Sequence, residues 1–133
     1  MPQIVSAIEH GPQWSSTAIF ITYDDCGCFY DHVAPPSNQL GLRVPMVIVS
    51  PWAKKGYTDS TPTSFIGMMT FVEHLFGLPA LTSLDANAYD YANSFDFTQS
   101  VSTATSFKAK TTPISPAEQN ELDAHPPDPD DPT

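Results

Sequence analysis

A short segment of the chain concentrates side chains that can bind a metal ion. Residues 22–36 read TYDDCGCFYDHVAPP and follow the apolar run TAIFI. Asp24 and Asp25 are adjacent, and two ionised carboxylates repel each other unless a cation or a shared proton compensates. A divalent cation would do this, because hard cations prefer oxygen ligands. The pair therefore indicates a candidate site for a divalent metal ion, whose identity the residues do not fix.

Other residues of the segment extend this hypothesis or compete with it. Asp31 and His32 follow the acidic pair, and His32 could add a nitrogen ligand or support catalysis. Ordinary turn chemistry is an alternative, because Asp hydrogen-bonds its own backbone and Gly27 can adopt positive φ. Cys26 and Cys28 could clamp a soft metal, but two thiolates fall short of the four ligands of structural zinc.

The sequence shows no catalytic nucleophile. It contains no Gly-x-Ser-x-Gly segment, so a hydrolase with that nucleophile turn has no support. No Ser or Thr stands at a predicted strand-to-helix turn beside a base. We therefore assign no catalytic residue within this chain.

Two apolar runs are predicted to be the strands that position the acidic segment. Residues 16–24 (STAIFITYD) and 43–51 (RVPMVIVSP) are rich in β-branched and apolar side chains. Near-continuous apolar character is typical of strands buried on both faces, as in a mostly parallel sheet with flanking helices. The long connection between them is of the kind that is usually functional.

Two helices are predicted to flank these strands. Residues 2–10 begin with a proline, which suits a first helical turn. Residues 63–77 form the clearest helix, with Thr63 or Ser64 as its cap and Gly77 at its end. Each helix has apolar side chains at helical spacing, which we expect to face the core: Ile4, Val5 and Ile8 in the first, and Phe65, Met68, Met69, Val72, Leu75 and Phe76 in the second.

Length and charge bound the possible functions. The chain has 133 residues and a net charge of −10, so it is a poor candidate for binding nucleic acid, which needs clustered Lys and Arg. No apolar run approaches the roughly 18 residues of a transmembrane helix. We expect one folded domain over residues 1–105, followed by a Pro-rich acidic tail over residues 106–133 that is too polar to fold.

Taken in order, these segments resemble the C-terminal part of the bacterial phosphoesterase family. That family contains phosphatidylcholine-type phospholipases C and acid phosphatases, within the alkaline phosphatase-like superfamily. The resemblance covers residues 1–105 and rests on the Tyr-Asp-Asp and Asp-His loop, the Arg-Val-Pro strand and the Ser-Pro-Trp end. It implies a partial α/β/α sandwich, hydrolysis of a phosphoester and a divalent metal.

The resemblance also implies roles for individual residues. Asp24 and Asp25 match the acidic pair that contributes to the metal and phosphate site, and Asp31 and His32 match the Asp-His that follows it. Many relatives carry a histidine after the Ser-Pro-Trp segment, where this chain has Gly-Tyr-Thr followed by Asp59. Asp59 could therefore replace a metal ligand.

Family members are much longer than this chain. Their N-terminal half carries a Glu-Asn metal motif and the Ser or Thr nucleophile, and many are secreted or periplasmic. We therefore expect a C-terminal portion that supplies one side of the site and is inactive on a phospholipid or phosphomonoester by itself. Such a chain would need the missing half or would self-associate. The alternative is a noncatalytic binding or assembly module built on a remnant of the same fold.

Overall fold

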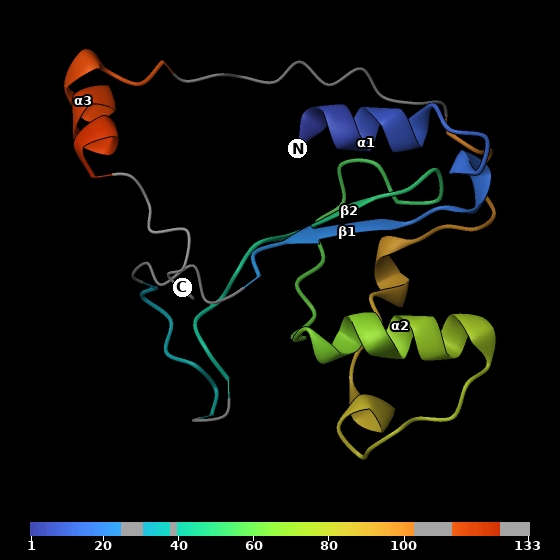
Figure 1. Cartoon of the computed structure of the whole chain (residues 1–133). Helices are drawn as coiled ribbons and strands as arrows, with labels where there is room; N and C mark the ends of the chain where they lie inside the picture. Colours follow the sequence, from blue (N-terminus) through green and yellow to red (C-terminus); the bar gives the residue numbers. More distant parts are fainter. Residues whose placement is uncertain (25–30, 38–39, 103–112, 126–133) are drawn as a thin grey trace.

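The computed structural model describes residues 1–24, 31–37, 40–102 and 113–125 (Figure 1). None of its helices is long and apolar enough to cross a membrane in the described part of the chain. In chain order the elements are α1 (Pro2–Glu9), the short 3-10 helix η1 (Trp14–Ser16), β1 (Ile19–Thr22), β2 (Met46–Val49), α2 (Ile66–Phe76), the 3-10 helices η2 (Asp85–Asn87) and η3 (Ala92–Ser94), and α3 (Pro116–Ala124).

The two strands pair in the antiparallel direction. Ile19 lies opposite Val49, and Thr22 lies opposite Met46. The α/β class is confirmed, but the predicted parallel pairing is wrong for these strands. Parallel neighbours need a crossover connection, which is usually a helix. The described residues between β1 and β2 contain no helix, so the chain turns back and its second strand runs in the opposite direction.

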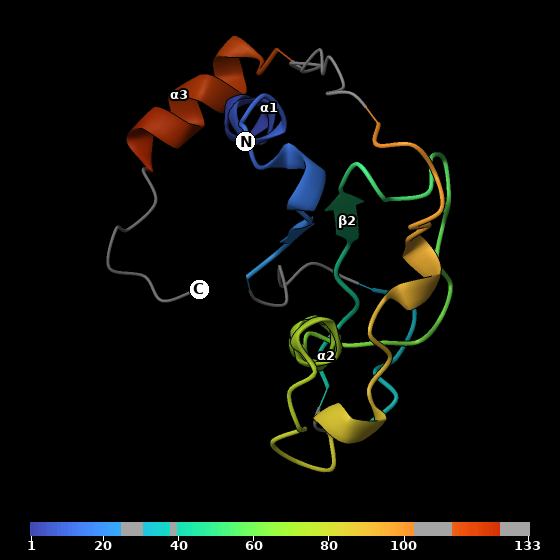
Figure 2. The same ribbon diagram turned by 90° about the vertical axis from the view of Figure 1, so that its right-hand side faces the viewer.

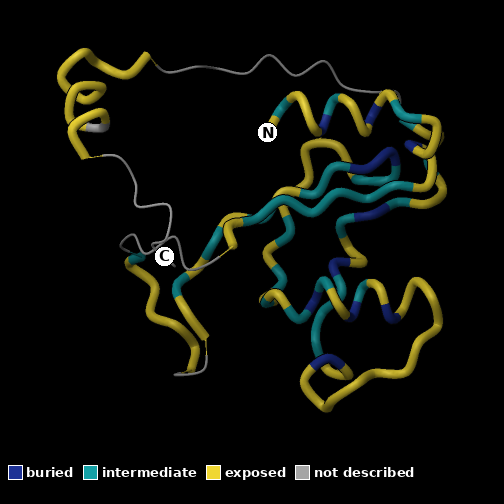
Figure 3. Tube along the Cα trace, viewed as in Figure 1, coloured by how far each residue is buried: buried dark blue, intermediate teal, exposed yellow. Residues whose placement is uncertain are grey.

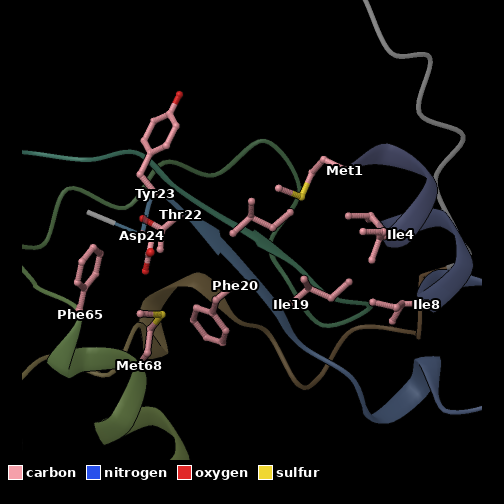
Figure 4. Close-up of a pocket in the computed structure, with 12 residues that line it drawn as sticks. Met1, Ile4, Ile8, Ile19, Phe20, Thr22, Tyr23, Asp24, Phe65 and Met68 are labelled. Atoms are coloured by element: carbon pink, nitrogen blue, oxygen red, sulfur yellow. The ribbon is translucent and has the colours of Figure 1, made fainter. Parts of the chain in front are cut away.

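Helices lie on opposite faces of this small sheet. Figures 1 and 2 both show α1 on one side of the strands and α2 on the other. Side chains alternate along β1, so Ile19 faces α1 and Phe20 faces the α2 layer (Figure 4). The ring of Phe20 lies 5.1 Å from that of Phe71 and 5.6 Å from that of Tyr91, both edge-on. The described elements thus form a helix, sheet and helix stack.

Aromatic side chains build the core on the α2 side of the sheet. Phe95 is buried and stacks on Phe71 with 5.1 Å between ring centres. Phe97 is exposed, and its ring stacks on Phe95 and lies 6.1 Å from the ring of Trp52. Trp14 is also buried, and its indole N–H donates to the carbonyl of Ser102 at 3.1 Å. Figure 3 shows buried residues gathered around the strands and the adjoining segments.

The face that α2 buries is small and polar, which differs from the prediction. Gly67, Thr70 and Glu73 are buried, and the Thr70 hydroxyl donates to the carbonyl of Asp85 at 3.1 Å. A small face lets the backbone of the following segment approach the helix closely. The expected apolar stripe is largely on the surface, since several of its members are exposed: Phe65, Met69, Val72, Leu75 and Phe76.

The ends of α2 follow the prediction at one terminus. Gly77 adopts the left-handed conformation with φ of 63° and terminates the helix, as a glycine without Cβ can do at low cost. The predicted capping by Thr63 or Ser64 is wrong. Phe65 precedes the first helical residue and no side chain caps it, because the Thr63 hydroxyl donates to the carbonyl of Tyr89 at 3.2 Å.

One helix lies within the segment that was expected to be an irregular tail. In α3, the Ser115 side chain accepts from the Glu118 amide while the Glu118 carboxylate accepts from the Ser115 amide. This reciprocal capping box follows from the Ser-x-x-Glu spacing, a signal that our sequence reasoning missed. The described side chains of α3 are exposed. Residues 106–112 and 126–133 of that segment lie outside the described residues, and the division at residue 105 stays a prediction.

Candidate functional site

The first predicted site residue lies just beyond β1. The strand ends at Thr22, and Asp24 follows as an exposed residue. Asp24 lines a cavity of about 530 Å³, together with Phe65 and Met68 from the start of α2. Figure 4 shows these three at one end of the cavity and α1 at the other. Among the described residues none forms a hydrogen bond or ion pair with the Asp24 carboxylate, so this carboxylate is available to a ligand.

Asp25, the neighbour of Asp24, lies outside the described residues, and so do Cys26 and Cys28. The predicted carboxylate pair, and the competing soft-metal clamp, therefore remain predictions from sequence.

Asp31 has another partner. Arg43 donates to it twice through its side chain, from Nε to Oδ2 and from Nη2 to Oδ1, both at 2.8 Å. The backbone N–H of Val33 donates to Oδ1 at 3.0 Å. These donors, the guanidinium first, hold the pKa of Asp31 well below its usual range. Asp31 is therefore ionised at neutral pH, and its lone pairs already serve Arg43 and the backbone.

His32 stands apart from this ion pair. Its side chain is 78% exposed, whereas that of Asp31 is 10% exposed. Its Nδ1 lies 3.8 Å from Oδ1 of Asp31, which is beyond hydrogen-bonding distance. Asp31 therefore does not hold the imidazole by a hydrogen bond, although a protonated His32 would lie within ion-pair distance of it.

Asp59 is held by three hydrogen bonds of its own. Its Oδ2 accepts from the Tyr89 hydroxyl at 2.6 Å and from the Ser94 hydroxyl at 3.2 Å, and its Oδ1 accepts from the Thr61 amide at 3.0 Å. Burial alone would raise the pKa of Asp59, but these donors together lower it. Burial, and then the hydrogen bond to Asp59, raise the pKa of Tyr89 to about 12. Asp59 thus joins the segment after β2 to residues 89–94.

The cavities also separate Asp59 from Asp24. Asp59 lines a smaller cavity of about 230 Å³, beside Met46 and Ile48 of β2 and Lys54. The cavity at Asp24 is lined by β1 and by no residue of β2. The two carboxylates therefore open into different cavities.

A divalent metal would need more ligands than the described residues supply. No three His, Cys, Asp and Glu side chains gather around one point in the described ranges. Asp31 and Asp59 use their oxygens for other donors, whereas no described residue donates to the Asp24 carboxylate. Within the described ranges the candidate metal site therefore consists of Asp24 alone, and metal binding there stays a prediction.

Two carboxyl groups outside the predicted site form a buried pair. Asp85 accepts hydrogen bonds from the Thr82 hydroxyl and from the amides of Leu81 and Thr82, which lower the pKa of Asp85 to about 2. Burial, and then a hydrogen bond with Asp85, raises the pKa of Glu73. Paired carboxyl groups with separated pKa values can act as acid and base. Asp85 has no exposed surface, so a substrate cannot reach it, and Oε1 of Glu73 is buried without a hydrogen-bond partner among the described residues.

His74, near the end of α2, pairs with an acidic residue of a later segment. Its Nδ1 lies 2.7 Å from Oδ2 of Asp90. Burial alone would raise the pKa of Asp90, but hydrogen bonds from His74 and the Ala92 amide lower it. Sixteen positions separate the two residues, so no local sequence pattern predicts that they pair.

Comparison with known proteins identifies the family of this chain. A model of the Phosphoesterase family matches residues 1–79. The non-hemolytic phospholipase C of Burkholderia pseudomallei is 35% identical over an alignment of 104 residues that covers 56% of this chain and 15% of that protein. The non-specific phospholipase C6 of Arabidopsis thaliana is 32% identical over an alignment of 113 residues that covers 63% of this chain and 22% of that protein.

A third relative is the non-hemolytic phospholipase C of Pseudomonas aeruginosa, which is 29% identical over 110 residues. This chain spans 16% of its length. The family match covers more than half of the chain, and it includes Asp24, the Asp31–Arg43 ion pair and Asp59. The chain therefore belongs to the Phosphoesterase family.

Proposed function

We propose that this chain contributes one side of the active site of a hydrolase that cleaves phosphoester bonds, of the phospholipase C or acid phosphatase type. The observation that carries the proposal is the family match over residues 1–79, within which β1 delivers Asp24 to an open cavity. The names of the relatives favour a phospholipid as substrate, and a phosphomonoester is the alternative. The fold of the complete enzyme would be an α/β/α sandwich of the alkaline phosphatase-like type.

The residues of this chain have separate tasks in the proposed site. Asp24, with Asp25, would hold a divalent metal, which when bound neutralises charge on the phosphoryl oxygens. The ion pair links Asp31 to Arg43, two residues of the connection between β1 and β2 that are 12 positions apart. It would hold these two parts of the connection together beside the site. Arg43 gives the Nε and Nη2 edge of its guanidinium to Asp31, so that edge is not available to a phosphate in this arrangement.

The nucleophile would lie outside this chain. We expect no hydrolysis of an aryl phosphate by the purified chain alone, with or without Ca²⁺, Mn²⁺ or Zn²⁺. Metal-dependent turnover that survives repeated purification would contradict this. A noncatalytic assembly module is the second candidate, favoured by the exposed apolar side chains of α1 and α2.

Calorimetry separates the two candidates. The wild-type chain is titrated with Ca²⁺, Mn²⁺ and Zn²⁺ and then with inorganic phosphate, beside Asp24→Ala and the double variant Asp24→Ala/Asp25→Ala. Glu121→Ala is the matched control, because it removes an exposed carboxylate from α3. A retained site predicts metal binding that the Asp24 variants lose and Glu121→Ala keeps. Equal heats from all four proteins would reject the site and leave the assembly module.

A further inference from the structure

The segment that follows α2 buries a single residue. Residues 78–88 are all described, and Asp85 is the only buried residue among them. Figure 3 shows most of this segment as exposed, and its large apolar side chains, Leu78, Leu81 and Leu84, all face solvent. A segment with few buried apolar contacts opens locally more easily than the core does. Its attachment to α2 therefore depends on polar contacts.

Two side chains of α2 contact Asp85. The Thr70 hydroxyl donates to the backbone carbonyl of Asp85 at 3.1 Å, and the Glu73 side chain meets the Asp85 carboxyl group. Glu73 is 5% exposed, and its Oε1 has no hydrogen-bond partner among the described residues. The buried contact between the helix and the segment is therefore a pair of acids.

The two carboxyl groups can hydrogen-bond only when they share a proton. Asp85 accepts from the amides of Leu81 and Thr82 at 2.6 and 2.8 Å and from the Thr82 hydroxyl. These donors stabilise the ionised form of Asp85, so the proton belongs to Glu73. A neutral Glu73 has an O–H to donate, whereas an ionised Glu73 can only accept. Two ionised carboxylates at this distance would repel each other.

The groups around Glu73 act on its charge in both directions. Asp85 of η2 opposes ionisation, whereas the charge of His74, its neighbour on α2, and the backbone N–H of Leu81 favour it. His74 in turn lies 2.7 Å from Asp90. Burial is the largest influence, and together with Asp85 it raises the pKa of Glu73 above its ordinary value of 4.5.

We propose that Glu73 and Asp85 form a proton-dependent latch, which fastens residues 78–88 to α2 when Glu73 is neutral and loosens them when Glu73 ionises. A group whose pKa is raised by folding stabilises the folded arrangement below its ordinary pKa, and this contribution is lost as the pH rises through the folded value. The latch is therefore closed in acid and loosens toward neutral pH. Neither residue lines the cavity at Asp24, so this inference does not rest on the proposed function.

The contacts at each end limit how far the segment opens. Gly77 precedes it with φ of 63°, and a glycine can change its backbone conformation without a Cβ clash. After the segment, the carbonyl of Tyr89 accepts from the Thr63 hydroxyl at 3.2 Å, and the Tyr89 hydroxyl donates to Asp59 at 2.6 Å. These contacts do not involve the latch, so we expect the chain from Tyr89 onward to stay in place.

A metal cation fits this pair less well than a proton. Both oxygens of Asp85 already accept from N–H or O–H donors, whose positive ends would oppose a cation. Ca²⁺ takes six or more oxygen ligands, and no third His, Cys, Asp or Glu side chain joins the pair in the described ranges. A shared proton needs only the two carboxyl groups that are present.

Hydrogen exchange of the full chain, followed from acidic to neutral pH, tests the latch. The reporting amides are those of Leu81, Thr82, Ala86 and Ala88, which donate within the segment. After correction for the intrinsic effect of pH on exchange, we expect their protection to fall at least about threefold as the pH rises.

The same amides should show that the opening is local. We expect them to be less protected than the amides of β1 and β2 at each pH. Their protection should also be insensitive to low urea concentrations, because a local opening exposes little surface. Protection equal to that of the strands would mean that the segment opens only when the whole chain unfolds, which overturns the proposal.

Matched variants assign the proton to Glu73. Glu73→Gln keeps a donor for Asp85 at every pH, so the protection of the segment should no longer fall as the pH rises. Glu121→Gln makes the same change at an exposed glutamate of α3 and should keep the wild-type pH dependence. His74→Gln should keep it too. If His74→Gln abolishes the pH dependence, the effect belongs to the pair of His74 and Asp90 and the latch is rejected.

Two measurements on the wild-type chain do not depend on whether a variant folds. In a carbon-13 NMR titration, the Glu73 carboxyl group should ionise at a higher pH than that of Glu121, and over the range in which the segment loses protection. Ionisation of both groups at the same pH overturns the proposal. Excess Ca²⁺ at neutral pH should leave the protection of the segment unchanged, whereas restored protection would make the pair a cation site and reject the proton latch.

Discussion

Replacing Gly67 with alanine tests how α2 is packed. Gly67 lies inside the helix, where alanine normally improves stability by about 0.5–1 kcal/mol relative to glycine. A Cβ at this position would overlap the backbone carbonyl oxygen of Tyr89, and it would lie 2.6 Å from the Thr63 hydroxyl and 3.0 Å from the Tyr91 ring. Helix propensity therefore predicts that Gly67→Ala raises the free energy of unfolding, whereas packing predicts that it lowers it.

Packing should dominate at this position. Overfilling a packed interior costs about 1–3 kcal/mol, and the obstacle here includes backbone, which cannot turn away as a flexible side chain can. With backbone as the obstacle we take the upper part of that range, about 2–3 kcal/mol; subtracting the gain in helix propensity of about 0.5–1 kcal/mol, we expect Gly67→Ala to lower the free energy of unfolding by about 1–2.5 kcal/mol. Relief of the overlap would move α2 away from residues 89–91, and with it the Phe65 and Met68 side chains beside Asp24.

Urea unfolding followed by circular dichroism measures the effect. Gly41→Ala is the control, because no atom lies within 4 Å of a Cβ there, and it should change stability by less than about 0.5 kcal/mol. A Gly67→Ala protein as stable as the wild type, or more stable, would show that helix propensity decides. The close approach of α2 to Tyr89 would then be refuted.

Two pH-dependent predictions follow from the ion pair at Arg43 and from the buried acid Glu73. Arg43 lowers the pKa of Asp31 from 3.8. The stability that this ion pair adds is therefore present above pH 3.8, and it is lost as the pH falls through the lower pKa of Asp31 in the folded protein. Thermal unfolding should therefore show Arg43→Ala destabilised above about pH 4 and converging on the wild type in acid, with Arg43→Lys intermediate; a constant difference would exclude the ion pair as its cause. Burial raises the pKa of Glu73 from 4.5, so wild-type stability should fall as the pH rises from 4.5 through the folded value. The advantage of Glu73→Gln, which keeps a donor for Asp85, should grow over the same range, and an advantage independent of pH would contradict this assignment.

Local sequence patterns located most of the regular elements. The apolar runs at 16–24 and 43–51 contain β1 and β2, and the predicted helices at 2–10 and 63–77 contain α1 and α2. Gly77 ends α2 because only a residue without Cβ takes φ of 63° easily. These features depend on neighbours in the chain, and such neighbours are visible in a sequence.

Pairing direction and burial were not visible in that way. The same two runs would suit a parallel or an antiparallel pair, and only the path of the connection decides between them. The apolar stripe of α2 was expected to be buried, yet its small face holds the contacts with residues 85–91. Gly67 and Thr70 are buried because the backbone of residues 85–89 approaches the helix. The spacing of apolar residues in the sequence does not indicate such a contact.

The same distinction between local sequence and tertiary contacts holds for the candidate site. The sequence by itself determined that Asp24 follows a strand and that its segment resembles a phosphoesterase loop, since both depend on residue types in order. The tertiary structure decided which donors occupy the other carboxylates: Arg43 takes the oxygens of Asp31, and Thr61, Tyr89 and Ser94 take those of Asp59. Hydrogen-bonding capacity is limited, so a carboxylate's role depends on which donors the fold brings to it.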